Sequence, residues 1–524
     1  MRKQVHGFRV PCPAHFSAHI VAAFGIFLML NAMPAPAHAQ EGMNRSRPNI
    51  VFILADDLGY GDVHALNADS AIPTPHLDQL AADGMTFIDA HSPSAVCTPT
   101  RYGLLTGRYC WRSRLKSGVL GGYSPPLIEA DRMTVASMLR NAGYHTAAFG
   151  KWHLGMNMPR RGDDDVQSER WDGDGNVDFA GKIANGPTTR GFEHFFGVSA
   201  SLDMAPYVWI EDERFTMMPS AQQPAQAFPG FVRKGPRSED FVLDDVLDTV
   251  ANRACQYITD HAGQDSPFFV YLPLTAPHKP VQPHSRFRGM TELGTYADFI
   301  VQVDDTVGRV LQSIEASGIR ENTLVIFTSD NGSFMRRLDS ADAHDHVDDE
   351  SIQAFRADRH RANGPWRGTK ADVWEAGHHV PFFARWPGVI EQGSVCERTV
   401  THTDFFATAA EIVGARLPDA AAEDSFSWLP SFKQDPDTAA RAAVINHSAN
   451  GMFAIRDGRW KLVLGNGSGG RQQPRGRPFE QPYHLFDLAA DPGETTNLAE
   501  QHAEVVARLT REFEEIRDSG RSRK

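Results

Sequence analysis

The sequence predicts an α/β protein: a large, mixed but mostly parallel sheet sandwiched by helices, with a smaller C-terminal antiparallel α+β subdomain. Short apolar runs alternate with segments of helical periodicity, which is typical of strands that helices cover on both faces. The length of 524 residues suits one large domain and a smaller one. After about residue 430 the apolar runs shorten and an amphipathic helix follows them, which indicates a separate unit.

Residues 1–39 are predicted to form a secretory signal peptide. Its parts are a basic start (Arg2, Lys3, Arg9), a short apolar run (20–30) and an Ala37-His38-Ala39 cleavage site. The run is shorter than the roughly 20 apolar residues that span a bilayer. No cysteine directly follows the cleavage site, which argues against a lipid anchor. We therefore expect a periplasmic or secreted protein without membrane association after the signal is removed.

Three apolar runs each end in polar side chains that carry chemistry. Residues 49–54 lead into Asp56 and Asp57, residues 268–272 into His278, and residues 324–327 into Asp330 and Asn331. Helical segments at 133–141 and 296–313 complete the pattern of an open α/β sheet, which binds ligands outside the carboxyl ends of its strands. Any one of these acids alone is more often a turn or helix-cap residue. Three such strand ends together predict one shared crevice.

Four side chains at these strand ends are candidate metal ligands, namely Asp56, Asp57, Asp330 and Asn331. In a buried crevice the carboxylates would repel one another unless a cation lay among them. Hard oxygen ligands favour calcium or magnesium over zinc.

Two long polar inserts, 156–190 and 332–363, interrupt the sheet pattern and are expected to be surface loops. Within the first, residues 172–178 have a faint likeness to a calcium loop. They lack the glycine at the sixth position and the closing glutamate, so a solvated loop is expected.

The C-terminal region is expected to contain four short strands and one helix. The strands are predicted at 443–446, 452–455, 460–464 and 483–488, and the helix at 503–517. We therefore predict a main domain over 44–430 and a C-terminal subdomain over 431–524.

Cys97-Thr98-Pro99-Thr100-Arg101 is the most informative motif of the chain. It is followed by Leu105-Thr106-Gly107-Arg108, then by Gly150-Lys151-Trp152-His153-Leu154-Gly155 and Arg367-Gly368-Thr369-Lys370. In these four motifs the chain resembles the type I, formylglycine-dependent sulfatases, an arylsulfatase-like family within the alkaline-phosphatase-like superfamily. The resemblance covers nearly the whole chain after the signal peptide. It implies a sulfuric ester hydrolase whose main domain is catalytic and has an alkaline-phosphatase-like fold.

The resemblance also implies a modified nucleophile and a bound calcium ion, with magnesium as the alternative. Cys97 would be oxidised to formylglycine by a formylglycine-generating enzyme, and the hydrated aldehyde would attack sulfur. The metal would be held by Asp56, Asp57, Asp330 and Asn331, with the modified Cys97 completing the sphere or lying beside it. Asp330 would act as the base.

The chemistry of a sulfate monoester gives roles to the remaining candidates. Its non-bridging oxygens need fixed cations, and Arg101, Lys151 and Lys370 supply them. Proton transfer near neutral pH points to His153 and His278. By resemblance, His278 with Lys370 would protonate the leaving oxygen, and His153 would assist the release of sulfate.

One segment departs from the family pattern. The family commonly has Glu-Gly-Gly-x-Arg-Val-Pro where this chain has Glu375-Ala376-Gly377-His378-His379-Val380-Pro381. Ala376 thus replaces a glycine and His379 an arginine. Both follow Lys370 closely, so local packing is expected to differ while every candidate catalytic position is kept.

Candidate substrate contacts lie outside these motifs. Asp203 is a candidate acceptor for sugar hydroxyls, and Tyr207 or Trp209 for stacking on a ring, although a packed aromatic cluster fits the pattern equally well. His402 and His447 are candidate rim residues. An exported enzyme with polar inserts fits a sulfated carbohydrate substrate, with aryl sulfates as the alternative.

Composition limits the partners. The net charge of −13 argues against nucleic acid and requires a local cationic pocket for any anionic substrate. Cys12 falls in the signal peptide, which leaves Cys97, Cys110, Cys255 and Cys396. With Cys97 modified, at most one disulfide can form.

Two other functions stay open. One is a phosphoester or phosphonate monoester hydrolase of the same superfamily. The other is a non-catalytic glycan-binding protein, which predicts the loss of a catalytic residue, whereas Cys97, the acids and His278 are all present.

Overall fold

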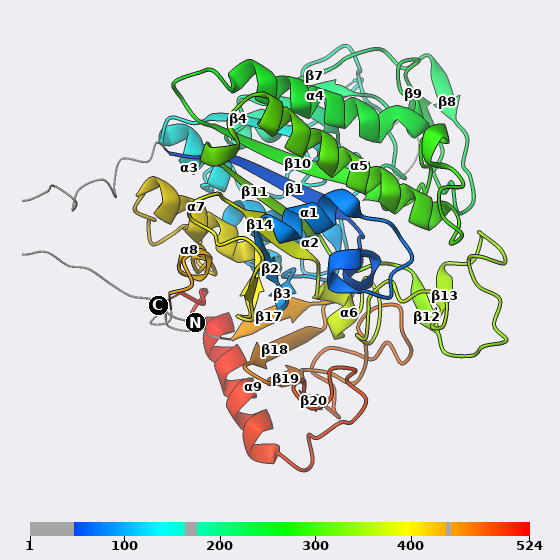
Figure 1. The fold of residues 1–524 in the computed structure, drawn as a ribbon, viewed down its shortest axis with the longest axis vertical. Coiled ribbons are helices and arrows are strands. Elements are labelled where there is room, and N and C mark those ends of the chain that lie inside the picture. Colours follow the sequence, from blue (N-terminus) through cyan, green and yellow to red (C-terminus); the bar gives the residue numbers. More distant parts are fainter. Residues whose placement is uncertain (1–46, 163–174, 436–440, 442, 524) are drawn as a thin grey trace, which may run out of the picture. The chain divides into compact units, whose positions relative to one another are not determined.

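The computed structural model describes residues 47–162, 175–435, 441 and 443–523 (Figure 1). The predicted signal peptide and residues 172–174 of the acidic stretch lie outside this part of the chain. Every helix in the described ranges is too short or too polar to cross a lipid bilayer.

A ten-stranded mixed sheet forms the centre of the described structure (Figure 1). In spatial order its strands are β15 (Ser394–Cys396), β2 (Met85–Phe87), β14 (Phe382–Arg385), β11 (Thr323–Ser329), β1 (Asn49–Asp56), β10 (Phe268–Pro277), β4 (His145–Lys151), β5 (His194–Val198), β6 (Ile210–Glu211) and β7 (Arg214–Phe215). β1 lies between β10 and β11 and runs parallel to both, with Phe52 opposite Tyr271 and Ile326. All residues of these three strands are buried, as their continuous apolar runs predict. The antiparallel pairs lie toward the edges, so the predicted fold class is confirmed.

Helices pack in two groups against this sheet (Figure 1). One group is α1 (Pro75–Ala82), α4 (Val246–His261) and α5 (Thr295–Ala316), and the other is α2 (Cys97–Thr106), α3 (Val135–Asn141) and α7 (Phe405–Val413). The helix predicted at 296–313 is confirmed as α5, whose apolar positions at helical spacing are buried. The helix predicted at 133–141 is confirmed as α3, which Thr134 caps by accepting a hydrogen bond from the backbone of Ser137.

The C-terminal region contains an antiparallel four-stranded sheet and a helix, as predicted. The elements are β17 (Val444–His447), β18 (Phe453–Asp457), β19 (Trp460–Val463), β20 (His484–Asp487) and α9 (Ala503–Asp518). α9 packs on β18 and β19, and its Leu509 and Phe513 are buried in a cluster with Ile455 and Leu462. The boundary at residue 430 stays a prediction.

Lys461 of β19 joins this sheet to the main domain. Its Nζ lies 2.9 Å from Glu375 Oε1 and 2.8 Å from Glu494 Oε1, and all three side chains are buried. Glu375 begins α6 (Glu375–His378), and its Oε2 lies 3.2 Å from Nδ1 of His379. The imidazole of His379 therefore stands beside Glu375, at the position where the resemblance predicts an arginine.

The second polar insert is only partly a surface loop. It contains two short parallel strands, β12 (Arg336–Leu338) and β13 (Ala354–Arg356). The prediction of a loop is wrong here because Phe334 and Phe355 are buried against Tyr296 of α5. In the first insert, Met156 and Ile183 are also buried. The high content of Asp and Arg in both inserts led to the prediction of surface loops, although each insert contains a few apolar residues that are buried.

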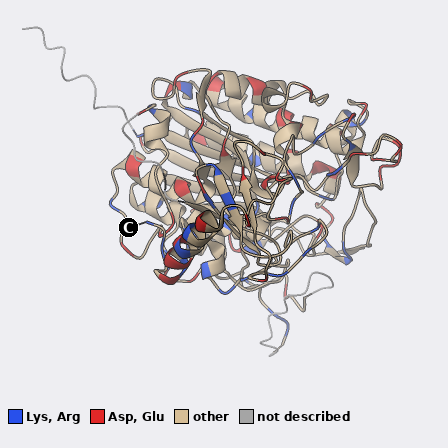
Figure 2. Cartoon of the chain, turned by 90° about the horizontal axis from the view of Figure 1, so that it is seen from below, with Lys and Arg blue, Asp and Glu red and all other residues tan. Residues whose placement is uncertain are grey.

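The remaining short elements are β3 (Ala90–His91), β8 (Ala221–Gln223), β9 (Gly235–Arg237), β16 (Val400–Thr401) and α8 (Leu429–Phe432). In the view of Figure 2, acidic and basic residues are interspersed over the ribbon. This mixture is consistent with the expectation that an anionic substrate is held by a local pocket rather than by the field of a whole face.

Candidate active site

The candidate site lies at the edge of the sheet where four parallel strands end. β1 ends at Asp56, β4 at Lys151, β10 just before His278, and β11 just before Asp330. These strands are neighbours in the order β11-β1-β10-β4, so their carboxyl ends meet at one place. The convergence predicted from the apolar runs is therefore present, and β4 adds a fourth strand end.

Cys97 is the first residue of α2 and is buried at this edge. It offers a ligand atom within 4.8 Å of those of Asp56 and Asp330. Arg101 follows one helical turn later and donates from Nη2 to Asp330 Oδ2 at 2.7 Å and from Nη1 to the carbonyl of Lys151 at 2.9 Å. The cysteine motif thus belongs to the helix that is anchored to two of the strand ends.

Lys151 neutralises Asp56. Its Nζ donates to Asp56 Oδ2 at 2.7 Å and to the hydroxyl of Ser201 at 2.8 Å. Ser201 follows β5 and lies 3.5 Å from the ring nitrogens of His278. Asp203 and Tyr207 of the same segment were predicted as substrate contacts, but no role was predicted for Ser201 itself, because a serine after a strand has no distinguishing pattern.

Asp57 lies between Lys370 and Asn331. Lys370 Nζ is 2.6 Å and 2.8 Å from the two carboxylate oxygens of Asp57, and Asn331 Nδ2 donates to Asp57 Oδ1 at 2.7 Å. His278 Nε2 is 3.7 Å from Asp57 Oδ2. Lys370 comes from the segment before α6, which thus joins the four strands, α2 and the segment after β5 at this place.

The two candidate histidines hold opposite tautomers. His278 places Nδ1 2.6 Å from the carbonyl of Lys279, so Nδ1 donates and Nε2 of the neutral ring faces the site as an acceptor. His153 places Nε2 2.7 Å from the carbonyl of Leu120, which leaves its buried Nδ1 as an acceptor without a partner. Burial, with Lys370 near His278 and Lys151 near His153, lowers the pKa of both rings well below the ordinary value.

The pKa values of the two central carboxyl groups are shifted in opposite directions. Burial, together with the charge of Asp56, raises the pKa of Asp330 to about 7. Burial would also raise the pKa of Asp56, but Lys151, His278 and Arg101 lower it below its ordinary value. Burial raises the pKa of the Cys97 thiol. Groups whose pKa values are pushed apart in one crevice are characteristic of catalytic sites.

The residues of this crevice fit a hard divalent cation. Asp56 Oδ1 and Asn331 Oδ1 are buried and have no hydrogen-bond partner among the described residues, and both are oxygen donors of the kind that calcium prefers. The sequence-based reason for a cation, unrelieved repulsion among the acids, is incomplete because Arg101, Lys151 and Lys370 already pair with them. The two oxygens without partners are the observation that favours a metal.

Backbone strain accompanies the site. Asp57, His153 and Ala371 have φ angles of 69°, 55° and 81°, in the left-handed region that such residues seldom adopt. Gly150, which precedes Lys151, has φ 122°, and an added Cβ would lie 2.1 Å from the carbonyl oxygen of Pro273. Glycine at this position therefore lets β4 pass close to β10 and turn Lys151 toward Asp56.

The candidate substrate contacts are only partly brought to the site. Asp203 is buried beside it, with Oδ1 4.0 Å from His278 Nδ1 and Oδ2 paired with Arg233. Tyr207 is buried and donates from its hydroxyl to the carbonyl of Arg233 at 2.6 Å, while Trp209 stacks on Phe196. The packed aromatic cluster is thus the arrangement that forms.

His402 and His447 do not lie at a rim. His402 is fully buried with Nε2 3.0 Å from the hydroxyl of Thr328, and burial lowers its pKa to about 3. His447 is buried with its ring against Phe453, and burial lowers its pKa to about 4. Both rings are packing residues because their segments pass behind β11 and into β17.

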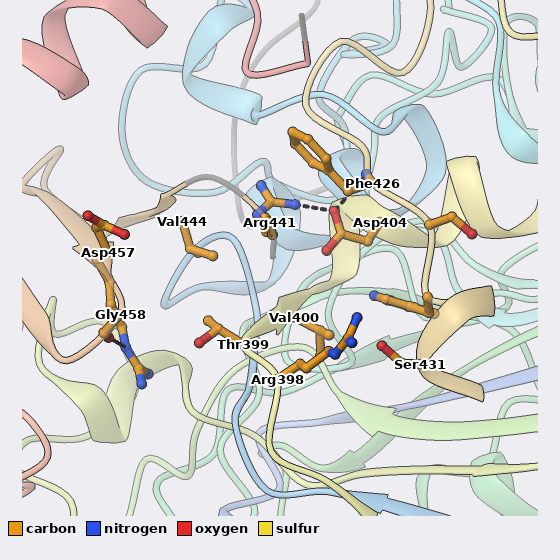
Figure 3. A pocket seen from close by; sticks show the side chains of 13 residues that line it. Arg398, Thr399, Val400, Asp404, Phe426, Ser431, Arg441, Val444, Asp457 and Gly458 are labelled. Atoms are coloured by element: carbon orange, nitrogen blue, oxygen red, sulfur yellow. Dashed lines mark hydrogen bonds and ion pairs between the residues drawn. The ribbon is translucent and has the colours of Figure 1, made fainter. Parts of the chain in front are cut away.

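A separate pocket of about 350 Å³ lies near the start of α7 and the C-terminal sheet (Figure 3). Its Arg441 is paired with Asp404, as the dashed line in Figure 3 shows. None of the predicted catalytic residues is among the thirteen that line it. The predicted catalytic residues therefore lie at the strand ends and not in this pocket.

Comparisons with known proteins agree with this geometry. A family model described as sulfatase matches residues 48–415, and one described as N-sulphoglucosamine sulphohydrolase, C-terminal, matches residues 369–519. An N-acetylgalactosamine-6-O-sulfatase of Bacteroides thetaiotaomicron is 32% identical over 513 residues, covering 91% of this chain and 94% of that protein.

Two solved structures are also similar. One, from a study of the metabolism of multiple glycosaminoglycans by Bacteroides thetaiotaomicron, has a TM-score of 0.76 and 30% identity, and the match covers 90% of this chain and 99% of that one. The other is the phosphonate monoester hydrolase of Agrobacterium radiobacter, with a TM-score of 0.58 and 21% identity over 90% of this chain and 96% of that one. At that identity the likeness concerns the fold alone, which is the predicted alkaline-phosphatase-like fold.

Replacing Gly150 with alanine is expected to disorder the site. The added Cβ meets the Pro273 carbonyl in a backbone conformation unsuited to alanine, so β4 must shift and Lys151 must leave Asp56. We expect a melting temperature several degrees lower and turnover reduced about 10-fold or more, measured by thermal unfolding and steady-state kinetics.

Gly143→Ala is the matched control. Gly143 also has a positive φ, 88°, but an added Cβ there meets nothing within 4 Å. Equal effects of the two substitutions would contradict the role of crowding at Gly150 and leave only backbone strain.

Proposed function

This chain belongs to the sulfatase family and is a sulfuric ester hydrolase, and from this premise we propose that it removes sulfate from a sulfated glycan outside the cytoplasm. The observation that carries the proposal is the position of Cys97, at the start of α2, among strand-end acids and three buried cations. The similar proteins named for N-acetylgalactosamine-6-O-sulfatase activity and for glycosaminoglycan metabolism support a sulfated carbohydrate as substrate. The predicted signal peptide supports export.

We propose that residue 97 acts after conversion to formylglycine, whose hydrated aldehyde would supply the hydroxyl nucleophile that attacks sulfur. All of α2 is buried, from Cys97 to Thr106. A formylglycine-generating enzyme therefore has to read this motif before the chain folds, which fits modification during export. Arg101 then orients the segment by holding it to Asp330 and to the Lys151 carbonyl.

The positions of the surrounding side chains support this proposal. Lys151 and Lys370 bring fixed positive charge to the place where the sulfate oxygens bind. Asp330, with its raised pKa, is the group that takes a proton from the attacking hydroxyl.

The two histidines transfer protons at different steps of the reaction. His278 turns Nε2 toward the site, and when protonated there it donates to the leaving oxygen with Lys370 beside it. His153 has a free acceptor at Nδ1, which suits removal of a proton during sulfate release.

We propose calcium as the resident metal, with magnesium as the alternative. Asp56, Asp57, Asp330 and Asn331 would hold it with residue 97, and it would supply positive charge that stabilises the sulfate oxygens in the transition state.

Turnover of matched sulfate and phosphate monoesters tests the proposed function. We expect 4-nitrophenyl sulfate and a sulfated N-acetylgalactosamine to be hydrolysed with a higher kcat/KM than 4-nitrophenyl phosphate or a phenyl phosphonate. Cys97→Ala should lose at least about 1,000-fold in kcat because it lacks the nucleophile. Faster cleavage of phosphate or phosphonate would favour the rival hydrolase activity, and binding of glycan without turnover would favour a glycan-binding protein.

Mass spectrometry of the tryptic peptide that ends at Arg101 tests the modification. We expect the mass to fall by the difference between hydrogen sulfide and oxygen when the thiol becomes an aldehyde. Protein made without a formylglycine-generating enzyme is the control and should keep the thiol and lose turnover. An unmodified Cys97 in fully active protein would contradict the proposed nucleophile.

Calcium binding is tested by thermal unfolding of chelated protein. Calcium at about 100 times its Kd should stabilise the protein by about 2.7 kcal/mol, and the shift should exceed that produced by magnesium at the same concentration. Asn331→Ala removes one of the two oxygens without partners and should weaken calcium binding about 10-fold or more. Asp69→Asn, at an exposed carboxylate, is the matched control. Full activity and an unchanged melting temperature after chelation would contradict a metal site.

A further inference from the structure

A second cavity, of about 300 Å³, opens beside the sulfate site. Gly368 and Thr369, which line it, directly precede Lys370 in the chain. The other lining residues are Arg336, Arg337, Asp339, Trp366, Arg367, Asp372, Arg471, Gln472 and Gln473. The volume is at the lower end of the range of ligand pockets, about 300 to 1,000 Å³. The cavity is thus large enough for part of a sugar and touches the segment that carries Lys370.

Arg471 reaches this cavity from the C-terminal region, and its backbone is firmly held. The carboxylate of Asp372 accepts hydrogen bonds from the backbone N–H groups of Arg471 at 2.5 Å, Gln472 at 2.9 Å and Thr369 at 2.9 Å. Gly470 packs so closely on Ala371 that an added Cβ would lie 2.3 Å from the carbonyl oxygen. The turn that carries Arg471 is therefore held against Ala371 and Asp372, which directly follow Lys370.

The basic side chains of the cavity fall into two groups. Arg337 is paired with Asp339 at 3.0 Å, and Arg367 donates to the carbonyl of Glu494 at 2.7 Å. In contrast, Arg336 and Arg471 have no carboxylate of the described residues within 4.0 Å, and neither has a side-chain hydrogen bond there. Two guanidinium groups therefore face the same cavity with their hydrogen-bonding groups unused.

Lys279 brings a further positive charge to this side of the site. It follows His278 and has no carboxylate partner among the described side chains, while its Nζ lies 4.9 Å from the centre of the Phe231 ring. Burial, with the charges of Arg471 and Lys370, lowers the pKa of Lys279 to about 8. Mutual repulsion among these cations is relieved when an anion binds between them.

We propose that this cavity is a subsite for a second anionic group, a sulfate or a carboxylate on the sugar next to the one that loses its sulfate. Guanidinium groups bind both anions through paired hydrogen bonds, and Arg336 and Arg471 are the two with such bonds to offer. Trp366, half-buried in the wall and stacked by its ring on His379, adds apolar surface suited to a sugar ring. The inference rests on the proposed sulfated-glycan function and narrows its substrate to a polyanionic glycan.

The test compares Arg471→Gln and Arg336→Gln with Arg475→Gln. Arg475 lies in the same turn, is exposed and does not line the cavity, so it is a matched control for the loss of one charge. The substrates are 4-nitrophenyl sulfate and a disaccharide of a uronic acid with 6-sulfated N-acetylgalactosamine. Two further disaccharides differ from this one only at the uronate. In the first, the carboxyl group is reduced to an alcohol, and in the second this alcohol carries a sulfate ester.

For Arg471→Gln we expect the ratio of kcat/KM on the uronate disaccharide to that on 4-nitrophenyl sulfate to fall about 10-fold to 100-fold. Arg336→Gln should lower the same ratio, Arg471→Lys should restore part of it, and Arg475→Gln should leave it at the wild-type value. The reduced disaccharide should be a poor substrate of the wild type and insensitive to Arg471→Gln. The uronate and added-sulfate compounds then show which anion the subsite prefers.

Two results would overturn the inference. One is an equal loss on all four substrates in Arg471→Gln, and the other is an effect no larger than that of Arg475→Gln. Where a disaccharide inhibits the wild type without being cleaved, its inhibition constant against 4-nitrophenyl sulfate replaces kcat/KM in the same ratios. Failure of the proposed function is distinct, because it appears as no turnover of any sulfate ester by the wild type.

Discussion

Three buried ion pairs hold the functional edge of the sheet together. They are Arg101 with Asp330, Lys151 with Asp56, and Lys370 with Asp57. Each charge is out of water, and a buried charge that loses its partner costs several kcal/mol. The pairs join α2 to β11, β4 to β1, and the segment before α6 to β1, so each pair forms only when these elements are neighbours as they are in this sheet. The parallel arrangement of the strands therefore determines the geometry of the site.

The same constraint reaches the C-terminal region through Ala371. Its backbone N–H donates to the carbonyl of Ala95 at 2.8 Å, and its carbonyl accepts from Ala449 at 3.0 Å. Ala371 keeps a φ angle of 81°, which costs about 1 to 3 kcal/mol and persists only where the surroundings impose it. Lys370 is thus positioned by contacts on two sides, the approach to α2 and the loop after β17. Lys461 of β19 adds a buried charged contact with Glu375 of α6, so the small antiparallel sheet supports the segment that carries Lys370 as well as the fold.

The strand ends were the most predictable part of this molecule, because continuous apolar runs of parallel strands place whatever follows them at one edge. This rule alone was enough to predict that Asp56, His278 and Asp330 lie together. Lys370 was predicted from its motif alone. The contacts of Ser201 and Arg471 could not be predicted from the sequence, because each depends on a tertiary contact between segments that have no periodic pattern. The candidate rim histidines failed for the opposite reason. His402 was predicted at the rim because it stands in a polar, loop-like sequence, whereas its ring is fully buried beside Thr328 of β11.

Positive side chains occur in two arrangements in this acidic protein: some are paired with carboxylates, and others have no carboxylate partner among the described residues. In the proposed sulfate site each cation already faces a carboxylate, so Lys151 and Lys370 would be oriented before substrate arrives. In the neighbouring cavity Arg336 and Arg471 have no carboxylate partner in the described part of the chain, so a bound anion would complete their hydrogen bonding. The first arrangement comes from the strand ends of the main domain, and the second takes one of its residues from a C-terminal turn. Under the two proposals, substitutions in that turn are therefore expected to change which glycan is accepted, while Lys151 and Lys370 keep their carboxylate partners.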